Sequence, residues 1–192
     1  SIGEEEIIGK TVMINVKGYT PVLSENKDIK MYYQDGSTFS VKVKDYNGKY
    51  SANKEIQFKI GSSTYYADTD SKGVAKLNIT EKAGKYKITA TYRHVSVTNN
   101  IIVKKILSMD TVKVKKSAKK IVLKAKLAKK LKGKTIKFKF NGNTYKAKTD
   151  KKGIAKVTVK NSVLKKLKVG KKVAYQASYV KETVKKTSKV LK

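Results

Sequence analysis

The 192-residue chain contains no cysteine and no tryptophan, and it has a single proline, Pro21. Without cysteine no disulfide can stabilise the fold, and cysteine usage says nothing about the compartment. No apolar run approaches the roughly 20 residues that a membrane-spanning helix needs. Because the chain starts at Ser1 without a leader-like segment, we expect a fragment or processed product of a longer protein.

Residues that usually carry catalysis are also scarce. The one histidine, His94, follows Arg93 and has no cysteine and no suitably spaced serine or aspartate beside it. The densest carboxylates near a turn are Asp68 and Asp70, which are too few for a metal site. No glycine-rich phosphate loop is present. We therefore expect no enzyme activity, no metal and no cofactor.

Acidic residues are rare in the second half of the chain. The sequence has 46 basic and 14 acidic residues, a formal net charge of +32, and every basic residue except Arg93 is lysine. Up to Lys105 there are 17 basic and 11 acidic residues, whereas the remainder has 29 lysines against Asp110, Asp150 and Glu182. Such asymmetry predicts two domains in different surroundings.

A gapless internal repeat supports this division. Residues 55–79 align with residues 135–159, and 12 of the 25 positions are identical. Both copies alternate apolar and polar residues, as in Ile56, Phe58 and Ile60, which is typical of half-buried antiparallel strands. Asp70 and Asp150 each stand three residues before a glycine, and this spacing predicts a tight turn.

Further alternating segments flank the repeat. We align Phe39, Val41 and Val43 with Ile121, Leu123 and Ala125, and Tyr86, Ile88, Ala90 and Tyr92 with Val173, Tyr175, Ala177 and Tyr179. Each copy then has about seven short strands. This predicts an all-β chain of two tandem immunoglobulin-like β-sandwich domains, at residues 25–105 and 106–192.

Two segments fall outside the repeat. The insertion 161–170 begins with Asn161, a good N-cap residue, and ends at Gly170, so we expect one or two helical turns. Residues 1–24 contain a strand-like run over 11–16. They form either the last strand of a preceding repeat, which is the simpler interpretation, or a strand that packs on the first domain.

The paired motifs resemble a known family. Residues 69–75 (TDSKGVA) and 149–155 (TDKKGIA) resemble the turn of bacterial immunoglobulin-like repeats of the invasin and intimin type. Together with residues 31–36 (MYYQDG) and 83–90 (AGKYKITA), they are more similar still to tandem repeats of adhesin-like surface proteins of methanogenic archaea. The lysine-rich second half resembles the domain that closes many such proteins. The resemblance implies an extracellular, cell-surface or cell-wall setting.

The family comparison raises two modification questions. Some surface domains of this kind form Lys–Asn isopeptide bonds beside an acid, and the candidates would be Lys42 or Lys44, Glu55, and Asn99 or Asn100. Alternation places both lysines on the outward face, so we do not favour a cross-link. Separately, Asn78 begins the one glycosylation sequon, Asn78-Ile79-Thr80.

Tyrosines are concentrated in the first half. Tyr65, Tyr86 and Tyr92 alternate inward, and Tyr86 is a candidate for the buried tyrosine corner of these sandwiches. In the second copy Val173 stands at that position, so the corner is either lost or replaced by Tyr175. Other tyrosines are candidates for exposure and for a glycan- or protein-binding face: Tyr32 or Tyr33, Tyr46, Tyr50 and Tyr66.

Lysine occupies nearly every outward position of the second copy. The predicted polyanion-binding residues are Lys137, Lys139, Lys146, Lys148, Lys151, Lys152, Lys156, Lys165, Lys166, Lys168, Lys171 and Lys172. Self-repulsion of this size destabilises a compact fold, so we expect a polyanion partner.

The sequence leaves the partner's class partly open. Lysine without arginine and without interleaved aromatics favours an anionic cell-wall polymer over nucleic acid. We expect a monomeric, non-catalytic adhesin-like chain, with the first domain as spacer or adhesive repeat and the second as a cationic wall-docking module. The alternatives are a purely structural stalk and nonspecific nucleic-acid or polyanion binding.

Overall fold

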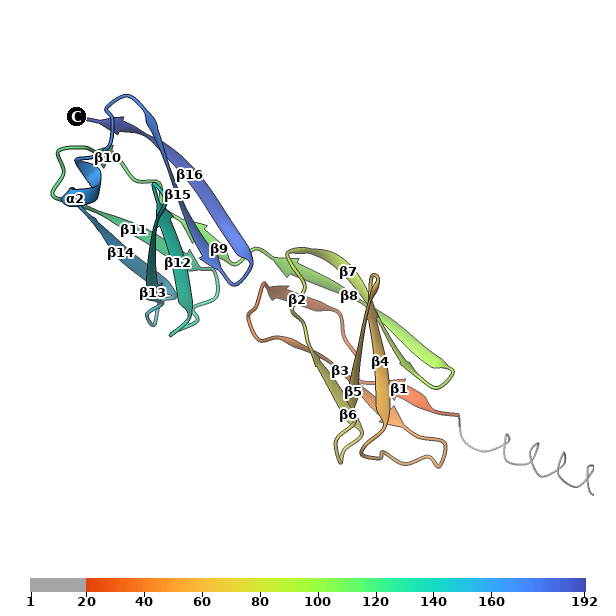
Figure 1. Cartoon of the computed structure of the whole chain (residues 1–192). Coiled ribbons are helices and arrows are strands. Elements are labelled where there is room, and N and C mark those ends of the chain that lie inside the picture. Colours follow the sequence, from red (N-terminus) through yellow and green to blue (C-terminus); the bar gives the residue numbers. More distant parts are fainter. Residues whose placement is uncertain (1–19) are drawn as a thin grey trace, which may run out of the picture. The chain divides into compact units, whose positions relative to one another are not determined.

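The computed structural model describes residues 20–192 (Figure 1). The chain divides into two compact units, which we treat separately. The first comprises residues 20–30, 36–79 and 85–102, and the second comprises 103–192 with the short segments 31–35 and 80–84. The strand predicted over residues 11–16 lies outside the described residues.

The first unit is a β-sandwich of two sheets. One sheet has the strand order β1-β3-β6 and the other β2-β8-β7-β4-β5. Their bounds are β1 Val22–Ser24, β2 Ile29–Tyr32, β3 Thr38–Lys44, β4 Glu55–Ile60, β5 Ser63–Asp68, β6 Val74–Asn78, β7 Gly84–Tyr92 and β8 Val95–Lys104. Residues 22–24 pair with β3, so the end of the segment 1–24 is a strand of this sandwich.

The second unit repeats the arrangement. Its sheets have the orders β14-β11-β9 and β10-β16-β15-β12-β13. Their bounds are β9 Leu107–Met109, β10 Val114–Lys115, β11 Lys120–Leu127, β12 Thr135–Phe140, β13 Asn143–Lys148, β14 Ile154–Lys160, β15 Lys172–Tyr179 and β16 Glu182–Leu191. The predicted all-β fold of two sandwiches is thus confirmed.

The alternating residues form the two cores. In the first unit Phe39 and Phe58 are fully buried and meet edge to face, with ring centroids 6.0 Å apart. In the second unit Phe140 stacks on Tyr175 at 6.4 Å. Each such side chain contributes about 1.5–3 kcal/mol by leaving water. The apolar residues that the two copies share therefore specify the sandwich, whereas many of the outward residues differ between the copies.

The predicted turns are also present in both units. Asp70 accepts hydrogen bonds from the N–H groups of Lys72 and Val74 at 2.8 and 3.0 Å, and Asp150 makes the same two bonds at the same distances. Gly73 closes the first turn at a φ of +78°, and a Cβ there would lie 2.8 Å from the Val43 carbonyl oxygen. Only glycine fits this position without strain.

One predicted alignment is wrong by two residues. Strand pairing places Phe39 opposite Leu77 and Leu123 opposite Val157, and residues 77 and 157 are equivalent in the repeat. Phe39 therefore corresponds to Leu123, not to Ile121, and Val41 corresponds to Ala125. Because side chains alternate with a period of two, a shift of two leaves the inward pattern intact and cannot be detected from it.

By contrast, the register of β7 and β15 follows the predicted alignment. Ile88 pairs with Ile60, and Tyr175 pairs with the equivalent Phe140. Tyr175 thus occupies the position of Ile88, not that of Tyr86. Its hydroxyl accepts a hydrogen bond from the Val112 N–H at 3.1 Å, so it anchors a neighbouring segment as a corner tyrosine would. Tyr86 itself is only half-buried.

The predicted helical insertion forms, with a different cap. Helix α2 spans Asn161–Leu164, and further turns follow it. Lys160 is the N-cap residue and makes no side-chain capping bond, so the prediction that Asn161 caps the helix is wrong. The Asn161 amide instead donates to the Ala118 carbonyl at 2.8 Å and fixes the insertion to a neighbouring segment.

Candidate polyanion-binding surface

All twelve predicted lysines are exposed, but they do not form one patch. The antiparallel register places Lys137, Lys139, Lys146 and Lys148 together on the outer face of β12 and β13. Lys156 lies on the outer face of the other sheet. Lys151 and Lys152 lie in the turn before β14, and the remaining five lie between α2 and the start of β15.

Lysine faces lysine across several strand pairs of the second unit. The opposed pairs are Lys120 with Lys160, Lys124 with Lys156, Lys137 with Lys146, and Lys172 with Lys189. Directly opposed side chains have Cβ atoms about 4.5–5.5 Å apart, and like charges at this separation are destabilising. In the first unit the pairings of β1 with β3, β3 with β6, and β4 with β5 and β7 bring no two lysines together.

The acids of the second unit offset little of this charge. The Asp35 carboxylate lies 3.8 Å from the Lys129 ammonium, but Lys129 is in the loop after β11 and not on an outer strand face. Glu182 Oε2 accepts hydrogen bonds from the backbone N–H groups of Ile106 and Leu107 at 2.9 and 2.6 Å. Asp150 is held by its turn, and the N–H groups of Ile154 and Lys152 keep the pKa of its carboxyl below the ordinary 3.8. Within residues 20–192, no carboxylate forms an ion pair with the outer-face lysines of either sheet.

Several lysines of these surfaces are absent from the predicted set. Lys120, Lys124 and Lys126 lie on the outer face with Lys156, and Lys185 and Lys189 lie on the outer face of β16. Their alternation with apolar residues could have identified them. The predicted set contains only lysines of the aligned repeat and of the insertion with the residues after it, and these lysines lie outside both.

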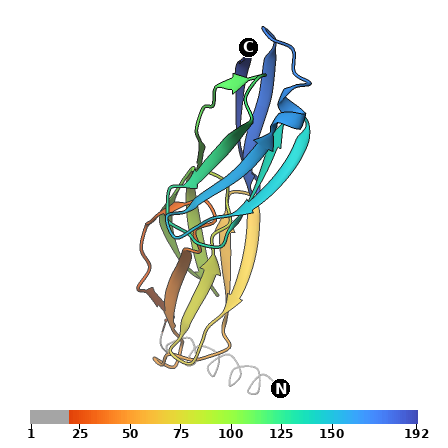
Figure 2. The same ribbon diagram turned by 90° about the vertical axis from the view of Figure 1, so that its left-hand side faces the viewer.

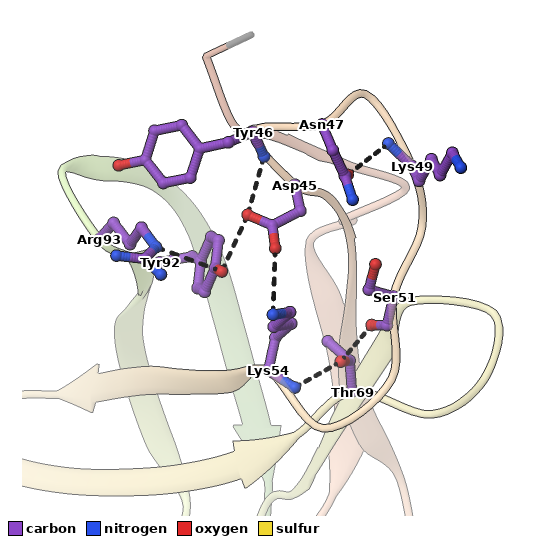
Figure 3. Close-up of polar contacts among 9 residues, drawn as sticks. All are labelled: Asp45, Tyr46, Asn47, Lys49, Ser51, Lys54, Thr69, Tyr92 and Arg93. Carbon is purple, nitrogen blue, oxygen red and sulfur yellow. Dashed lines mark hydrogen bonds and ion pairs between the residues drawn. The ribbon is translucent and has the colours of Figure 1, made fainter. Parts of the chain in front are cut away.

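The first unit carries a polar cluster that the second lacks (Figure 3). The Asp45 carboxylate is 7% exposed and accepts bonds from the Tyr92 hydroxyl at 3.0 Å and the Tyr46 N–H at 2.8 Å. The Lys54 ammonium lies 3.3 Å from its other oxygen. Burial raises the pKa of Asp45, but these three partners together outweigh burial and bring that pKa below 3.8. The cluster anchors the loop between β3 and β4.

Arginine and aromatic side chains cover the outside of this cluster. The Arg93 guanidinium lies 4.9 Å from the Tyr46 ring centroid, and its Nε donates to the Tyr92 hydroxyl at 3.3 Å. His94 is exposed, and its Nδ1 is 3.4 Å from the Tyr46 hydroxyl. The cation–π contacts and hydrogen bonds give these residues a structural role in the hairpin between β7 and β8.

No protein-family model matches this chain. No curated protein matches it either. Solved structures do resemble it in fold. One is described as a Ca²⁺-stabilised adhesin that helps an Antarctic bacterium reach out and bind ice: identity is 14%, TM-score 0.32, and 92% of this chain is covered. This chain spans 49% of that one, about half its length.

Two further structures show the same level of likeness. Invasin, described as a bacterial integrin-binding protein, has 15% identity and a TM-score of 0.35, with 86% of this chain and 38% of that chain covered. Tandem immunoglobulin domains of titin have 14% identity and a TM-score of 0.36, with coverage of 91% and 97%. Likenesses at this level say nothing about ligand or partner.

The tyrosines predicted to be exposed fall into two groups. Tyr46, Tyr50 and Tyr66 are 39%, 43% and 58% exposed, as predicted. Tyr33, in contrast, is 2% exposed and Tyr32 is half-buried, so neither joins an exposed aromatic face. Among the residues predicted to be core, Tyr92 is buried, whereas Tyr65 is only half-buried at the edge strand β5.

The isopeptide candidates do not gather at one site. The ammonium groups of Lys42 and Lys44 lie 4.2 and 5.2 Å from the Tyr50 ring centroid. Glu55 is exposed opposite Asp68. The Asn99 amide and the Asn100 N–H both donate to Asp28 at 3.1 and 2.9 Å. The candidate lysines thus contact Tyr50, whereas the candidate asparagines contact Asp28.

The remaining surface features concern modification, metals and membranes. Asn78 is exposed at the end of β6, opposite Thr38. Within residues 20–192, no three histidine, aspartate or glutamate side chains gather closely enough to hold a metal ion. No helix in the same part of the chain has the length and apolar character needed to cross a bilayer.

Proposed function

We propose that this chain is part of a non-catalytic, adhesin-like cell-surface protein whose second sandwich docks electrostatically on an anionic cell-wall polymer. The proposed domains are residues 25–105, a spacer or adhesive repeat that contacts a glycan or protein, and residues 106–192, the docking module. The observation that carries the proposal is the set of four directly opposed lysine pairs, which occur on both outer faces of one unit and have no acidic partner among residues 20–192.

The physical argument is that a bound polyanion relieves the repulsion between the opposed lysines. Lysines placed opposite one another destabilise the unbound sheet. A bound polyanion replaces this repulsion with attraction and releases its own counterions, so binding stabilises the fold and weakens steeply with salt. A purely structural stalk needs no such arrangement, and the first unit has almost the same fold without it.

Co-sedimentation of the full chain with isolated anionic cell walls tests the proposal. We expect binding at 50 mM NaCl that is lost at 500 mM. Binding that is unchanged at high salt would contradict the electrostatic mechanism, and no binding at either salt concentration would favour the structural stalk. A parallel titration with duplex DNA tests the nucleic-acid alternative, which predicts an equal affinity for DNA.

We also propose Asn78 as a glycan acceptor, because its side chain is accessible at the end of a strand. Intact-mass measurement of the native protein, compared with Asn78→Gln, tests this. A mass that equals the sequence mass in both proteins would contradict it.

A further inference from the structure

Three lysine-rich segments that are distant in sequence meet at one end of the second unit. The Asn161 N–H donates to the Lys119 carbonyl at 2.9 Å, and Lys120 pairs with Lys160. The Lys116 N–H donates to the Leu191 carbonyl at 2.9 Å, and Lys172 pairs with Lys189. Figures 1 and 2 both show α2, β10 and the C-terminus at this end. We call residues 115–120, 160–172 and 189–192 the lysine pole.

The lysine pole has a higher charge density than the rest of the unit. Its three segments contain twelve lysines and no aspartate or glutamate. All twelve lysines are exposed: Lys115, Lys116, Lys119, Lys120, Lys160, Lys165, Lys166, Lys168, Lys171, Lys172, Lys189 and Lys192. Seven of these are absent from the set predicted from sequence, because backbone contacts between distant segments bring them together.

Acidic groups lie at the opposite end of the same unit. Glu182 binds the N–H of Ile106, the carbonyl of Ile106 accepts from Ala128, and the neighbouring Leu127 N–H donates to the Gly153 carbonyl of the Asp150 turn. Strand β14 runs from this turn to the pole, a length of roughly 20 Å. Asp110 lies between the two ends, where its N–H bonds to the Lys124 carbonyl. This end also carries exposed lysines, among them Lys129, Lys130, Lys151 and Lys152, but Asp150 and Glu182 reduce its positive charge. The lysine pole, which has no acid, is therefore the more densely charged end of the unit.

The insertion, which supplies three of the twelve lysines of the pole, is held to the sandwich by two buried leucines. Leu164 is fully buried and Leu167 is 6% exposed, so both side chains enter the core of the sandwich. Between and beyond them, Lys165, Lys166 and Lys168 point to solvent. The corresponding connection between β6 and β7, residues 79–83, contains Glu81 and no helix. The insertion thus adds fixed positive charge without adding an acid.

We infer that the lysine pole is the primary binding site, and that its ligand is a flexible polymer of phosphate groups. This inference rests on the function proposed above. Lysine presents a compact charge with three donors and binds phosphate as a point charge, so a polymer with closely spaced phosphates matches twelve lysines with no acid among them. A flexible chain can wrap around three short loops. A rigid duplex would instead favour an element that enters a groove.

The test compares two matched variants of the full chain that each remove four charges. The pole variant is Lys165→Gln, Lys166→Gln, Lys168→Gln and Lys171→Gln. The control variant is Lys137→Gln, Lys139→Gln, Lys146→Gln and Lys156→Gln. All eight side chains are exposed, and circular dichroism verifies that both variants are folded. The probe is long-chain inorganic polyphosphate, with polygalacturonate and duplex DNA in parallel.

The lysine pole as primary binding site and electrostatic docking in general predict distinguishable outcomes. In 100 mM NaCl the pole variant should lose affinity for polyphosphate on the order of 10²- to 10³-fold, since each flexible-chain contact contributes a salt exponent of about 0.7. The control variant should lose less than about tenfold. Equal losses would overturn the pole as the primary site but leave electrostatic docking intact. A wild-type chain that does not bind polyphosphate, or that binds polygalacturonate or DNA as well, would overturn the phosphate-polymer ligand.

Discussion

Thr69 and Thr149 are buried hydroxyls at equivalent positions in the two units. Each Oγ1 donates to a backbone carbonyl at 2.6 Å, to Ser51 in the first unit and Leu131 in the second. Each also accepts a backbone N–H at 2.9 Å, from Lys54 and Lys134. Thr69 therefore connects the loop after β3 to the turn before β6, and Thr149 connects the loop after β11 to the turn before β14.

Replacing one of these hydroxyls gives a residue-scale prediction. Thr149→Val keeps the shape but leaves a buried carbonyl and a buried N–H without their partner, so we expect a loss of about 1–3 kcal/mol in the free energy of unfolding. Thr158→Val, at an exposed strand position, is the control and should change it by less than about 0.5 kcal/mol. Urea unfolding measures both, and equal effects would contradict the assigned role.

Acid sensitivity is the second prediction at this scale. The backbone N–H of Val74 and then that of Lys72 lower the pKa of Asp70, and those of Ile154 and Lys152 lower the pKa of Asp150. A carboxyl whose pKa is lowered on folding contributes stability above its ordinary pKa of 3.8, and this contribution is lost as pH falls through the lower folded value. We expect the melting temperature to be level from pH 7 to about 5 and to fall below pH 4.

Substitution identifies the groups responsible. The double variant Asp70→Asn and Asp150→Asn should melt lower at pH 7 and lose less on acidification than the wild type. Asp68→Asn, at an exposed strand position, controls for the removal of charge alone. If the double variant loses as much as the wild type below pH 4, other carboxyls govern acid unfolding.

At the scale of elements, the sequence predicted more about faces than about registers. The alternation of Ile56 and Phe58 with polar residues identified the buried face correctly. The match of Phe39 to Ile121 was wrong because the loop after β11 is shorter than the loop after β3, and alternation does not detect a shift of two residues. Loop length depends on contacts such as those of Asp45, which no local pattern reveals.

For the candidate site too, the sequence predicted which residues are exposed but not which residues lie together. Exposure of the twelve predicted lysines followed from alternation and turn chemistry, and every one of them is exposed. Which other lysines lie beside them did not follow, because hydrogen bonds between distant segments bring Lys119 to the insertion at Asn161 and Lys116 to the C-terminal strand at Leu191. The N-cap of α2 was also misplaced by one residue, since the Asn161 amide bonds to Ala118 across the loops and not to its own helix.

The insertion supports an element-scale prediction. Leu164→Ala removes a fully buried side chain that fixes the insertion to the core, and we expect a loss of about 2–5 kcal/mol in the free energy of unfolding. Val169→Ala, at a residue 47% exposed, should be close to neutral. Hydrogen exchange of the amides in residues 161–170 reports the local effect, and unchanged protection in Leu164→Ala would contradict the anchoring role.

At the scale of the whole molecule, charge differs between two units of the same fold. Lysine repulsion across β11–β14, β12–β13 and β15–β16 should make the second unit sensitive to ionic strength. Raising NaCl from 20 to 500 mM should increase the melting temperature of the second unit by about 5 °C or more, because screening weakens the opposed pairs. Amide exchange resolves the two units, and a rise confined to the first unit would contradict this account.

The most direct test of the central claim is the salt dependence of polyphosphate binding by the intact chain. Fluorescence anisotropy between 50 and 500 mM NaCl gives the association constant at each salt concentration. If six or more lysines contact the polymer, its logarithm should fall linearly with the logarithm of salt, with a slope of about −4 or steeper. Binding that does not weaken with salt would contradict the assignment of the second unit as an electrostatic docking module, and absence of binding at 50 mM NaCl would contradict a phosphate polymer as its ligand.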